Sequence, residues 1–378
     1  MRTVASSFFV LCLLAPATLA AQAAPDRELI TVRSEILGET RRVFVSVPPS
    51  YEKAGPARRY PLVIVTDGEG HSATAVVNAA RELGRHGLMP EVVVAGIENA
   101  GGYDHRVRDL TPPGLSVSGS SRNEGGDRFL DFLERELIPQ LDARFRTAAP
   151  RALVGHSSGG ILATYAAATR DTYRVVIALD TPIHLDGNWL AERLLDRARK
   201  GGQPVRYASY NAVFGWPEKA WAALTAAAPA SWILRGDKFQ NETHNSMPML
   251  GAYLGFRELF ADYSRKSAPT YPTTSILPYY ESLTDVFGGR LVPPLPLMRD
   301  VVDDLLLEGR GAAAADAYAA LIAAYGDQPR SEETRARIAE VSSRPAPTET
   351  VESLLATPLA TAQEIAPYVG VWEGESRR

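Results

Sequence analysis

The stretch from Leu153 to Gly160 constrains this chain more than any other. A Gly-x-Ser-x-Gly pentapeptide, Gly155 to Gly159, lies between an apolar run and a segment of small and apolar residues at helical spacing. A strand, a very tight turn and a helix in this order put Ser157 on a strained backbone with its hydroxyl exposed. The two glycines let strand and helix approach more closely than a Cβ atom permits. We therefore predict that Ser157 is a nucleophile; the alternative is a glycine-rich turn with an incidental serine.

Short apolar segments alternate with helical patterns on both sides of this turn. Continuous apolar runs of this length are typical of strands buried on both faces. Their alternation with helices predicts an α/β fold, a mostly parallel sheet with helices on both faces. We expect a hairpin over 29–37 and 42–47, strands at 60–66, 91–97, 174–179, 205–211 and 232–235, and helices at 74–83, 127–145, 189–199, 217–224 and 246–260.

Residues 1–23 have the pattern of a secretory signal peptide. Arg2 supplies a positive start, residues 8–14 form a short apolar run, and Ala21-Gln22-Ala23 fits a cleavage site. The apolar run is too short for a membrane span, so a periplasmic or secreted protein is expected and an uncleaved anchor is the alternative. Cys12, the only cysteine, lies inside this segment. The mature chain therefore has no thiol for a disulfide or a cysteine nucleophile.

The composition is that of a soluble globular protein, with 45% hydrophobic residues, 22% charged residues and a net charge of -4. No basic run or basic-aromatic stripe is present, which argues against a nucleic-acid partner. We expect no membrane contact after removal of the signal peptide, and no metal or organic cofactor is implied. The oligomeric state stays open.

A serine nucleophile needs a general base, and the base needs a carboxylate to orient it. In the α/β-hydrolase fold the order along the chain is serine, acid, histidine. Of the six histidines, two follow Ser157, namely His184 and His244. His184 comes directly after the first strand beyond Ser157, too early for an acid to precede it. We predict that His244, in a polar loop after the last strand, is the base; the alternative is an isolated surface histidine.

The identity of the acid is less constrained. It should follow the 205–211 strand, where Glu218 is the first carboxylate. Glu218 equally suits the first turn of a helix behind Pro217, a common stabilising arrangement. We predict Glu218 as the acid, with Asp180 at the carboxyl end of the preceding strand as the second candidate and Asp237 as the third.

Several motifs in this order resemble the putative esterase family, also called esterase D-like, over about residues 28–265. That family includes siderophore esterases, S-formylglutathione hydrolase, feruloyl esterases and mycolyltransferases. The motifs are Asp67-Gly68-x-x-His71, Asp109-Leu110-Thr111-Pro112, Phe129-x-x-Phe132-x-x-x-Glu136-Leu137-Ile138-Pro139, Gly155-His156-Ser157-x-Gly159-Gly160 and Glu242-Thr243-His244-x-Ser246.

The resemblance implies an α/β-hydrolase fold with Ser157 as nucleophile and His244 as base. It also implies an oxyanion hole made by the backbone N–H of Ser158 and that of Gly68 or Glu69, donors aimed at a developing negative oxygen.

In one respect the chain departs from the family pattern. Many members carry an Asn-Glu pair after the penultimate strand, whereas here Asn211 is followed by Ala212. The acid is therefore displaced to Glu218, relocated or absent, and an absent acid would leave a Ser-His dyad.

The loops at 99–126 and 180–203 leave the carboxyl ends of strands, where ligands bind in sheets of this class. Arg106 and Arg108 in the first and Trp189 in the second would form a basic and aromatic rim. We predict these three residues, with His156 beside the nucleophile, as substrate contacts. The alternative is that the arginines pair with acids of their own loop, since exposed ion pairs are common.

The C-terminal part has a different composition. Residues 271–296 are rich in proline, and helical segments at 297–307 and 312–325 resemble the small tetratricopeptide-like pair that follows the esterase domain in some relatives. Residues 368–374 read as one strand. We predict a signal peptide at 1–23, an α/β-hydrolase domain at 24–270, a helical extension at 271–345, and a linker with a strand-like segment at 346–378.

The sequence thus predicts a secreted or periplasmic serine esterase that acts on a small-molecule ester through a Ser-His-acid acyl-enzyme mechanism. An acyltransferase of the same fold, and a hydrolase-like binding protein that has lost turnover, are the alternatives.

Overall fold

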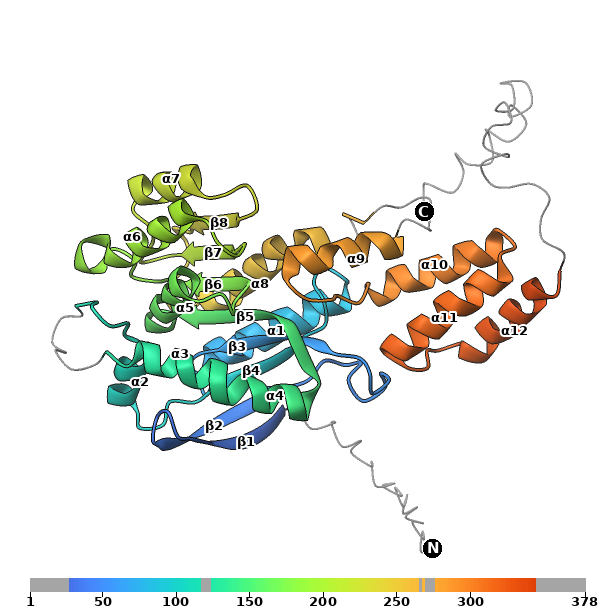
Figure 1. The fold of residues 1–378 in the computed structure, drawn as a ribbon, viewed down its shortest axis with the longest axis horizontal. Helices are drawn as coiled ribbons and strands as arrows, with labels where there is room; N and C mark the ends of the chain where they lie inside the picture. The colour runs from blue at the N-terminus through green and yellow to red at the C-terminus, as the bar shows by residue number, and fades with distance from the viewer. Residues whose placement is uncertain (1–26, 117–123, 265–266, 269–275, 345–378) are drawn as a thin grey trace, which may run out of the picture.

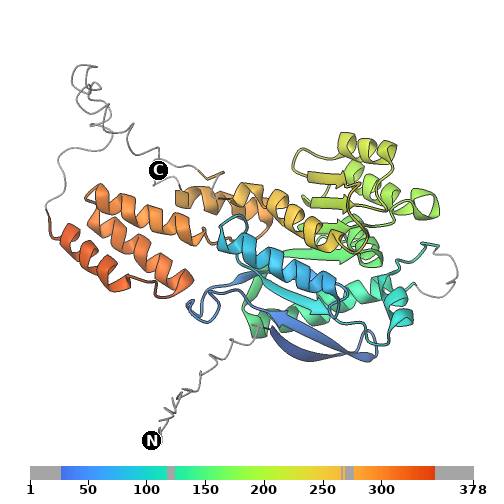
Figure 2. The same ribbon diagram turned by 180° about the vertical axis from the view of Figure 1, so that it is seen from behind.

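The computed structural model describes residues 27–116, 124–264, 267–268 and 276–344 (Figures 1 and 2). The predicted signal peptide and the predicted strand at 368–374 lie outside these residues.

The core of the protein is one eight-stranded sheet, in the order β1-β2-β4-β3-β5-β6-β7-β8. β1 pairs antiparallel with β2 and β2 pairs antiparallel with β4, while all other neighbours are parallel. This arrangement confirms the predicted mostly parallel sheet of the α/β-hydrolase fold. The strands are β1 (Arg27–Ser34), β2 (Glu39–Ser46), β3 (Tyr60–Val65), β4 (Val93–Ile97), β5 (Thr147–His156), β6 (Val175–Leu179), β7 (Arg206–Asn211) and β8 (Ile233–Lys238).

Every residue of β3, β4, β6 and β7 is buried. Continuous apolar strands need cover on both faces, and two sets of helices supply it (Figure 1). The helices α1 (His71–Arg85) and α8 (Met247–Leu259) share one hydrophobic cluster with one face of the sheet. The opposite face packs against α3 (Gly126–Phe132), the π-helical turn η1 (Leu133–Leu137), α4 (Ile138–Phe145), α5 (Ser158–Thr169), α6 (Leu185–Lys200) and α7 (Glu218–Ala227).

Among the residues that the structure describes, three helices lie where the sequence did not indicate them. In α2 (Tyr103–Leu110), inside the predicted 99–126 loop, only Asp109 and Leu110 are buried, so it lacks the apolar stripe that marks a helix. In α9 (Ile276–Phe287), Pro278 falls in the first turn, where proline costs no hydrogen bond inside the helix. The third, α12 (Ser331–Ser342), buries only Ser331 and Ile338.

The C-terminal helices α9, α10 (Leu295–Leu307), α11 (Gly311–Tyr325) and α12 pack against the rest of the chain. Phe287 of α9 stacks on Phe260 with ring centroids 5.2 Å apart. The backbone N–H of Gly55 donates to the carbonyl oxygen of Ala323 over 3.0 Å, and the guanidinium of Arg58 lies 4.1 Å from the ring centroid of Tyr325. The extension thus shares the hydrophobic cluster of α1 and α8.

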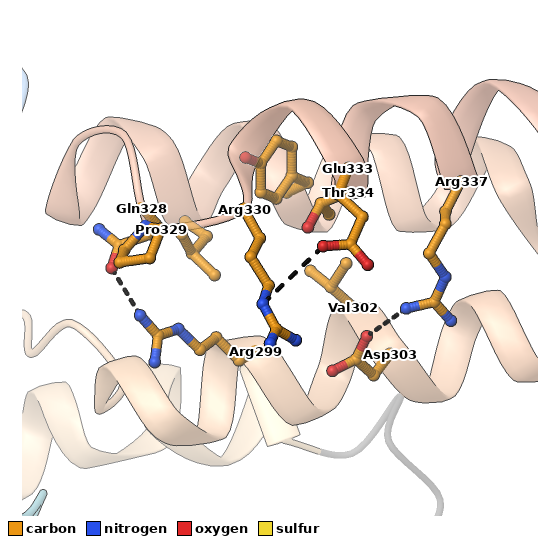
Figure 3. A pocket seen from close by; sticks show the side chains of 11 residues that line it. Arg299, Val302, Asp303, Gln328, Pro329, Arg330, Glu333, Thr334 and Arg337 are labelled. Atoms are coloured by element: carbon orange, nitrogen blue, oxygen red, sulfur yellow. Dashed lines mark hydrogen bonds and ion pairs between the residues drawn. The ribbon is translucent and has the colours of Figure 1, made fainter.

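A cavity of about 390 Å³ lies between α10, α11 and α12 (Figure 3). Its arginines already have partners within the extension. Arg337 pairs with Asp303 over 3.2 Å, Arg330 pairs with Glu333 over 3.8 Å, and Arg299 donates to the amide oxygen of Gln328 over 2.8 Å. Helices α10, α11 and α12 lie toward the opposite end of the molecule from α5 (Figure 1).

In the part of the chain that the structure describes, none of the helices combines the length and the apolar character needed to cross a membrane.

Candidate active site

Ser157 lies in a sharp turn between β5, which ends at His156, and α5, which begins at Ser158. Its backbone has φ 58° and ψ -119°, a left-handed conformation that a residue with a Cβ atom rarely adopts. The N–H of Ser157 donates to the carbonyl oxygen of Leu179 over 2.9 Å. This bond ties the turn to the end of β6, the neighbouring strand.

The glycines around Ser157 are required by close approach. A Cβ atom on Gly155 would overlap the carbonyl group of Gly159, and one on Gly159 would overlap the hydroxyl of Thr66. A side chain at either position would push α5 away from the sheet. The tight strand-turn-helix arrangement predicted from the sequence is therefore present.

Asp180 directly follows β6, beside the Ser157 turn, and its side chain has no exposed surface. Its Oδ2 atom accepts a hydrogen bond of 2.7 Å from Nδ1 of His244. Its Oδ1 atom accepts three further bonds from consecutive backbone N–H groups, those of Ala212 (2.8 Å), Val213 (3.0 Å) and Phe214 (2.9 Å).

These contacts decide the charge of Asp180. Burial by itself raises the pKa of a carboxyl group, because the ionised form loses its hydration. The backbone N–H groups of Ala212 and Phe214 and the contact with His244 outweigh burial, so the pKa of Asp180 lies below its ordinary value. The carboxylate is therefore ionised at neutral pH and can hold the Nδ1 hydrogen of His244.

Glu218 is not the carboxylate that contacts His244, and that prediction is corrected. Glu218 is the first residue of α7, exposed to solvent, and lines a cavity of about 260 Å³ with Trp216 and Trp221. Among the described residues, the carboxylate bonded to a ring nitrogen of His244 is that of Asp180. The physical reason is that the turn at 212–214 donates three N–H groups to Asp180 and contains no carboxylate of its own. Asp237, the third candidate, is exposed in β8.

The geometry also distinguishes between Gly68 and Glu69, the two residues predicted to donate a backbone N–H to the oxyanion hole together with Ser158. Ser158 is the first residue of α5, and the first N–H groups of a helix have no acceptor inside it. The N–H of Gly68 donates to the carbonyl oxygen of Ile97 over 2.7 Å, so this group is not free for a substrate. The N–H of Glu69 is therefore the remaining candidate to join that of Ser158 in the oxyanion hole, and this role stays a prediction.

Arg106 lies beside the nucleophile. Its Nε and Nη2 atoms donate to the two carboxylate oxygens of Asp67 over 2.5 and 2.9 Å, and Nη1 lies 3.2 Å from Oγ of Ser158. Arg108, in contrast, donates to Asp109 and Glu39, each over 2.7 Å. Both arginines thus pair with carboxylates, and Arg106 is the one that reaches the turn at Ser157.

The two remaining predicted substrate contacts, Trp189 and His156, pack against neighbouring side chains, and Trp189 is half-buried. Trp189 stacks on Tyr165 of α5, with ring centroids 6.0 Å apart, and the guanidinium of Arg193 lies 4.2 Å from its ring centroid. His156 is 7% exposed, and its Nε2 atom lies 2.8 Å from the carbonyl oxygen of His244. The prediction that His156 contacts the substrate is therefore corrected, because its ring faces the protein.

Sequence reasoning missed two contributors to this site. The backbone N–H groups of residues 212–214 leave no trace in side-chain patterns. The ring of Phe214 meets the ring of His244 edge-on, with centroids 5.5 Å apart, and an isolated aromatic residue in a loop gives no comparable signal. Within the described ranges, no group of three histidine, cysteine, aspartate or glutamate side chains is arranged to hold a metal ion.

Comparison with known proteins gives one family match. A family model described as putative esterase matches residues 34–235. The siderophore triacetylfusarinine C esterase of Aspergillus fumigatus is 37% identical over 141 residues, which cover 35% of this chain and 48% of that protein. The chain thus spans about half the length of this curated relative.

Solved structures show similar folds. An IroE-like serine hydrolase from Shewanella oneidensis superposes with a TM-score of 0.65 and 26% identity, covering 78% of this chain and 98% of that one. The siderophore hydrolase EstA from Aspergillus nidulans superposes with a TM-score of 0.55, covering 69% of this chain and 100% of that one. Its 17% identity supports likeness of fold alone.

Proposed function

This chain belongs to the putative esterase family, and on that premise we propose that it is a serine hydrolase that cleaves carboxylic esters with Ser157, His244 and Asp180. The observation that carries the proposal is the 2.7 Å bond between His244 and the buried carboxylate of Asp180, next to the Ser157 turn. A nucleophile, a base and an orienting carboxylate are the groups that such chemistry needs.

In the proposed reaction, the Nδ1 hydrogen of His244 is held by Asp180, which leaves Nε2 as the basic nitrogen. Nε2 takes the proton of Ser157 while Oγ attacks the ester carbonyl carbon. The N–H groups of Ser158 and Glu69 stabilise the negative oxygen of the tetrahedral intermediate. The intermediate collapses, His244 gives its proton to the departing alcohol, and an acyl-enzyme remains. Water then attacks in the same way and releases the acid.

Two finer points extend the proposal. We infer a siderophore ester as the substrate class. The Aspergillus fumigatus protein that matches 141 residues of this chain is named as a siderophore triacetylfusarinine C esterase. We also infer export to the periplasm or the medium, because residues 1–23 have the pattern of a signal peptide. Assays of the purified protein with ferric and iron-free siderophore esters test the substrate class. N-terminal sequencing of the exported chain tests the cleavage of the signal peptide.

The test of the central proposal is hydrolysis of p-nitrophenyl acetate by the wild type and by Ser157→Ala. We expect turnover by the wild type, loss of nearly all of it in the variant, and labelling of Ser157 by a fluorophosphonate probe. Circular dichroism of the variant controls for folding. Labelling at Ser158, or unchanged turnover in Ser157→Ala, would contradict the proposal.

A further inference from the structure

His156 is the last residue of β5 and directly precedes Ser157. Besides the 2.8 Å contact of Nε2 with the carbonyl oxygen of His244, its Nδ1 atom lies 3.5 Å from Oγ of Ser72 at the start of α1. A carbonyl oxygen only accepts hydrogen bonds, so Nε2 must carry the hydrogen and Nδ1 is left to accept from the hydroxyl of Ser72. Both ring nitrogens of His156 therefore face protein groups.

We propose that His156 is a positioning residue, which holds the main chain of His244 so that the imidazole stays between Asp180 and Ser157. The inference rests on the proposed function, because His156 acts through the proposed base. His244 is then fixed at two points, by Asp180 at the ring and by His156 at the carbonyl oxygen. The bond from the ring to Asp180 alone would let the main chain of His244 rotate about the Cα–Cβ bond relative to the ring. The bond from His156 to the carbonyl oxygen holds the main chain as well and so restricts this rotation.

The surroundings of His244 show why such a bond matters. The side chain of His244 is 34% exposed. Beyond its bonds to Asp180 and His156, hydrogen bonds join its neighbours to one another within the loop. Ser246 accepts from the N–H of Thr243 over 2.8 Å and donates to Glu242 over 2.6 Å. These bonds shape the loop without tying it to the sheet. The bond from His156 ties the base to the strand that carries the nucleophile.

The chemistry of His156 suits this role. Its ring packs on the ring of His244 with centroids 4.3 Å apart, and the ring of His71 lies 6.0 Å away. Burial, together with the neighbouring His244, lowers the pKa of His156 to about 4. His156 therefore donates as a neutral ring. A charged group here would oppose the imidazolium that forms on His244 during the reaction, since like charges disfavour each other at this range.

Three substitutions at position 156 test the role. Met has a similar length and no donor, Gln places an amide N–H near the position of Nε2, and Asn carries the same amide one methylene shorter. We expect His156→Met and His156→Asn to lower kcat for p-nitrophenyl acetate about tenfold, which corresponds to about 1.4 kcal/mol of barrier. KM should change less than about twofold, and His156→Gln should recover most of kcat. The rate of Ser157 labelling by a fluorophosphonate should follow kcat.

The outcomes separate the possible roles. Equal losses in the Gln and Asn variants, or a raised KM with unchanged kcat, would overturn the positioning role, the second result in favour of a substrate contact. Thermal unfolding curves show whether each variant is folded under the assay conditions. If the Met variant does not fold, the comparison of His156→Gln with His156→Asn still tests the positioning role. A wild type that neither hydrolyses the ester nor is labelled would refute the proposed function instead.

Discussion

The carboxyl ends of β6 and β7 are neighbours in the sheet, and each is followed by a carboxylate that could serve the base. Asp180 after β6 is fully buried and accepts three backbone N–H bonds in addition to the bond from His244. Glu218, beyond β7, is exposed in the first turn of α7. There a glutamate stabilises the helix through its dipole.

Both carboxylates lie between Ser157 and His244 in the chain, so the difference in their surroundings, and not their order, is what favours Asp180 as the proposed acid. A carboxylate beside an imidazole must stay ionised in a site shielded from water, and burial alone opposes ionisation. Residues 212–214, directly after β7, contribute backbone donors to Asp180, so the ends of both strands shape the surroundings of the proposed acid. The proposed triad thereby has a carboxylate without the Asn-Glu pair that many members of the family carry after the penultimate strand.

The largest expected effect concerns His244, the proposed base that either carboxylate, Asp180 or Glu218, would have to orient. His244→Ala should lower kcat for p-nitrophenyl acetate by roughly 10⁴-fold or more, close to the loss in Ser157→Ala, because such residues act as a unit. Steady-state kinetics of the two single variants and the double variant measure this. Additive losses in the double variant would show that the two residues do not act together.

A smaller effect tests the contribution of β7. The side chain of Val213 is 58% exposed, so its contribution to the site is the N–H that donates to Asp180. Val213→Pro removes that donor and should lower kcat by roughly tenfold, the scale of one hydrogen bond to a charged group. Val213→Ala keeps the N–H and is the matched control. Equal activity of the two variants would show that the backbone hydrogen bond from Val213 to Asp180 does not contribute to catalysis.

The smallest effect concerns stability. Because the folded state lowers the pKa of Asp180, its ionised form contributes stability above the ordinary pKa of about 3.9 and loses it as pH falls through the lower folded value. The wild type should therefore exceed Asp180→Asn in free energy of unfolding at pH 7, and the gap should narrow below about pH 4. Urea unfolding at several pH values checks this. A gap that stays constant or widens as pH falls would contradict the low pKa.

The sequence was informative wherever a local pattern decides the structure. The buried strands and the turn at Ser157 follow from apolar runs and from glycines whose Cβ atoms would overlap the backbone or Thr66. Helix α2 was missed because ion pairs to other segments, such as Arg108 with Glu39 of β2 over 2.7 Å, hold it in place of an apolar stripe. Ion pairs between segments give no periodic signal.

The candidate site was predictable in part for the same reason. Ser157 and His244 were selected by motif and order along the chain, and the structure brings both into contact with the end of β6. Asp180 ranked second because its main-chain donors at 212–214 lie more than thirty residues away in sequence. Backbone donors carry no residue identity, so only the fold reveals them.

The most direct test of the central claim compares Asp180→Asn with Glu218→Gln in kcat/KM for p-nitrophenyl acetate. Both changes replace a carboxylate by an amide of the same shape. The account predicts a loss of roughly 10²- to 10⁴-fold for Asp180→Asn, because the amide no longer holds His244 in the reactive tautomer, and a change of less than about twofold for Glu218→Gln, since substitutions of exposed residues usually have small effects. A large loss in Glu218→Gln together with retained activity in Asp180→Asn would contradict it.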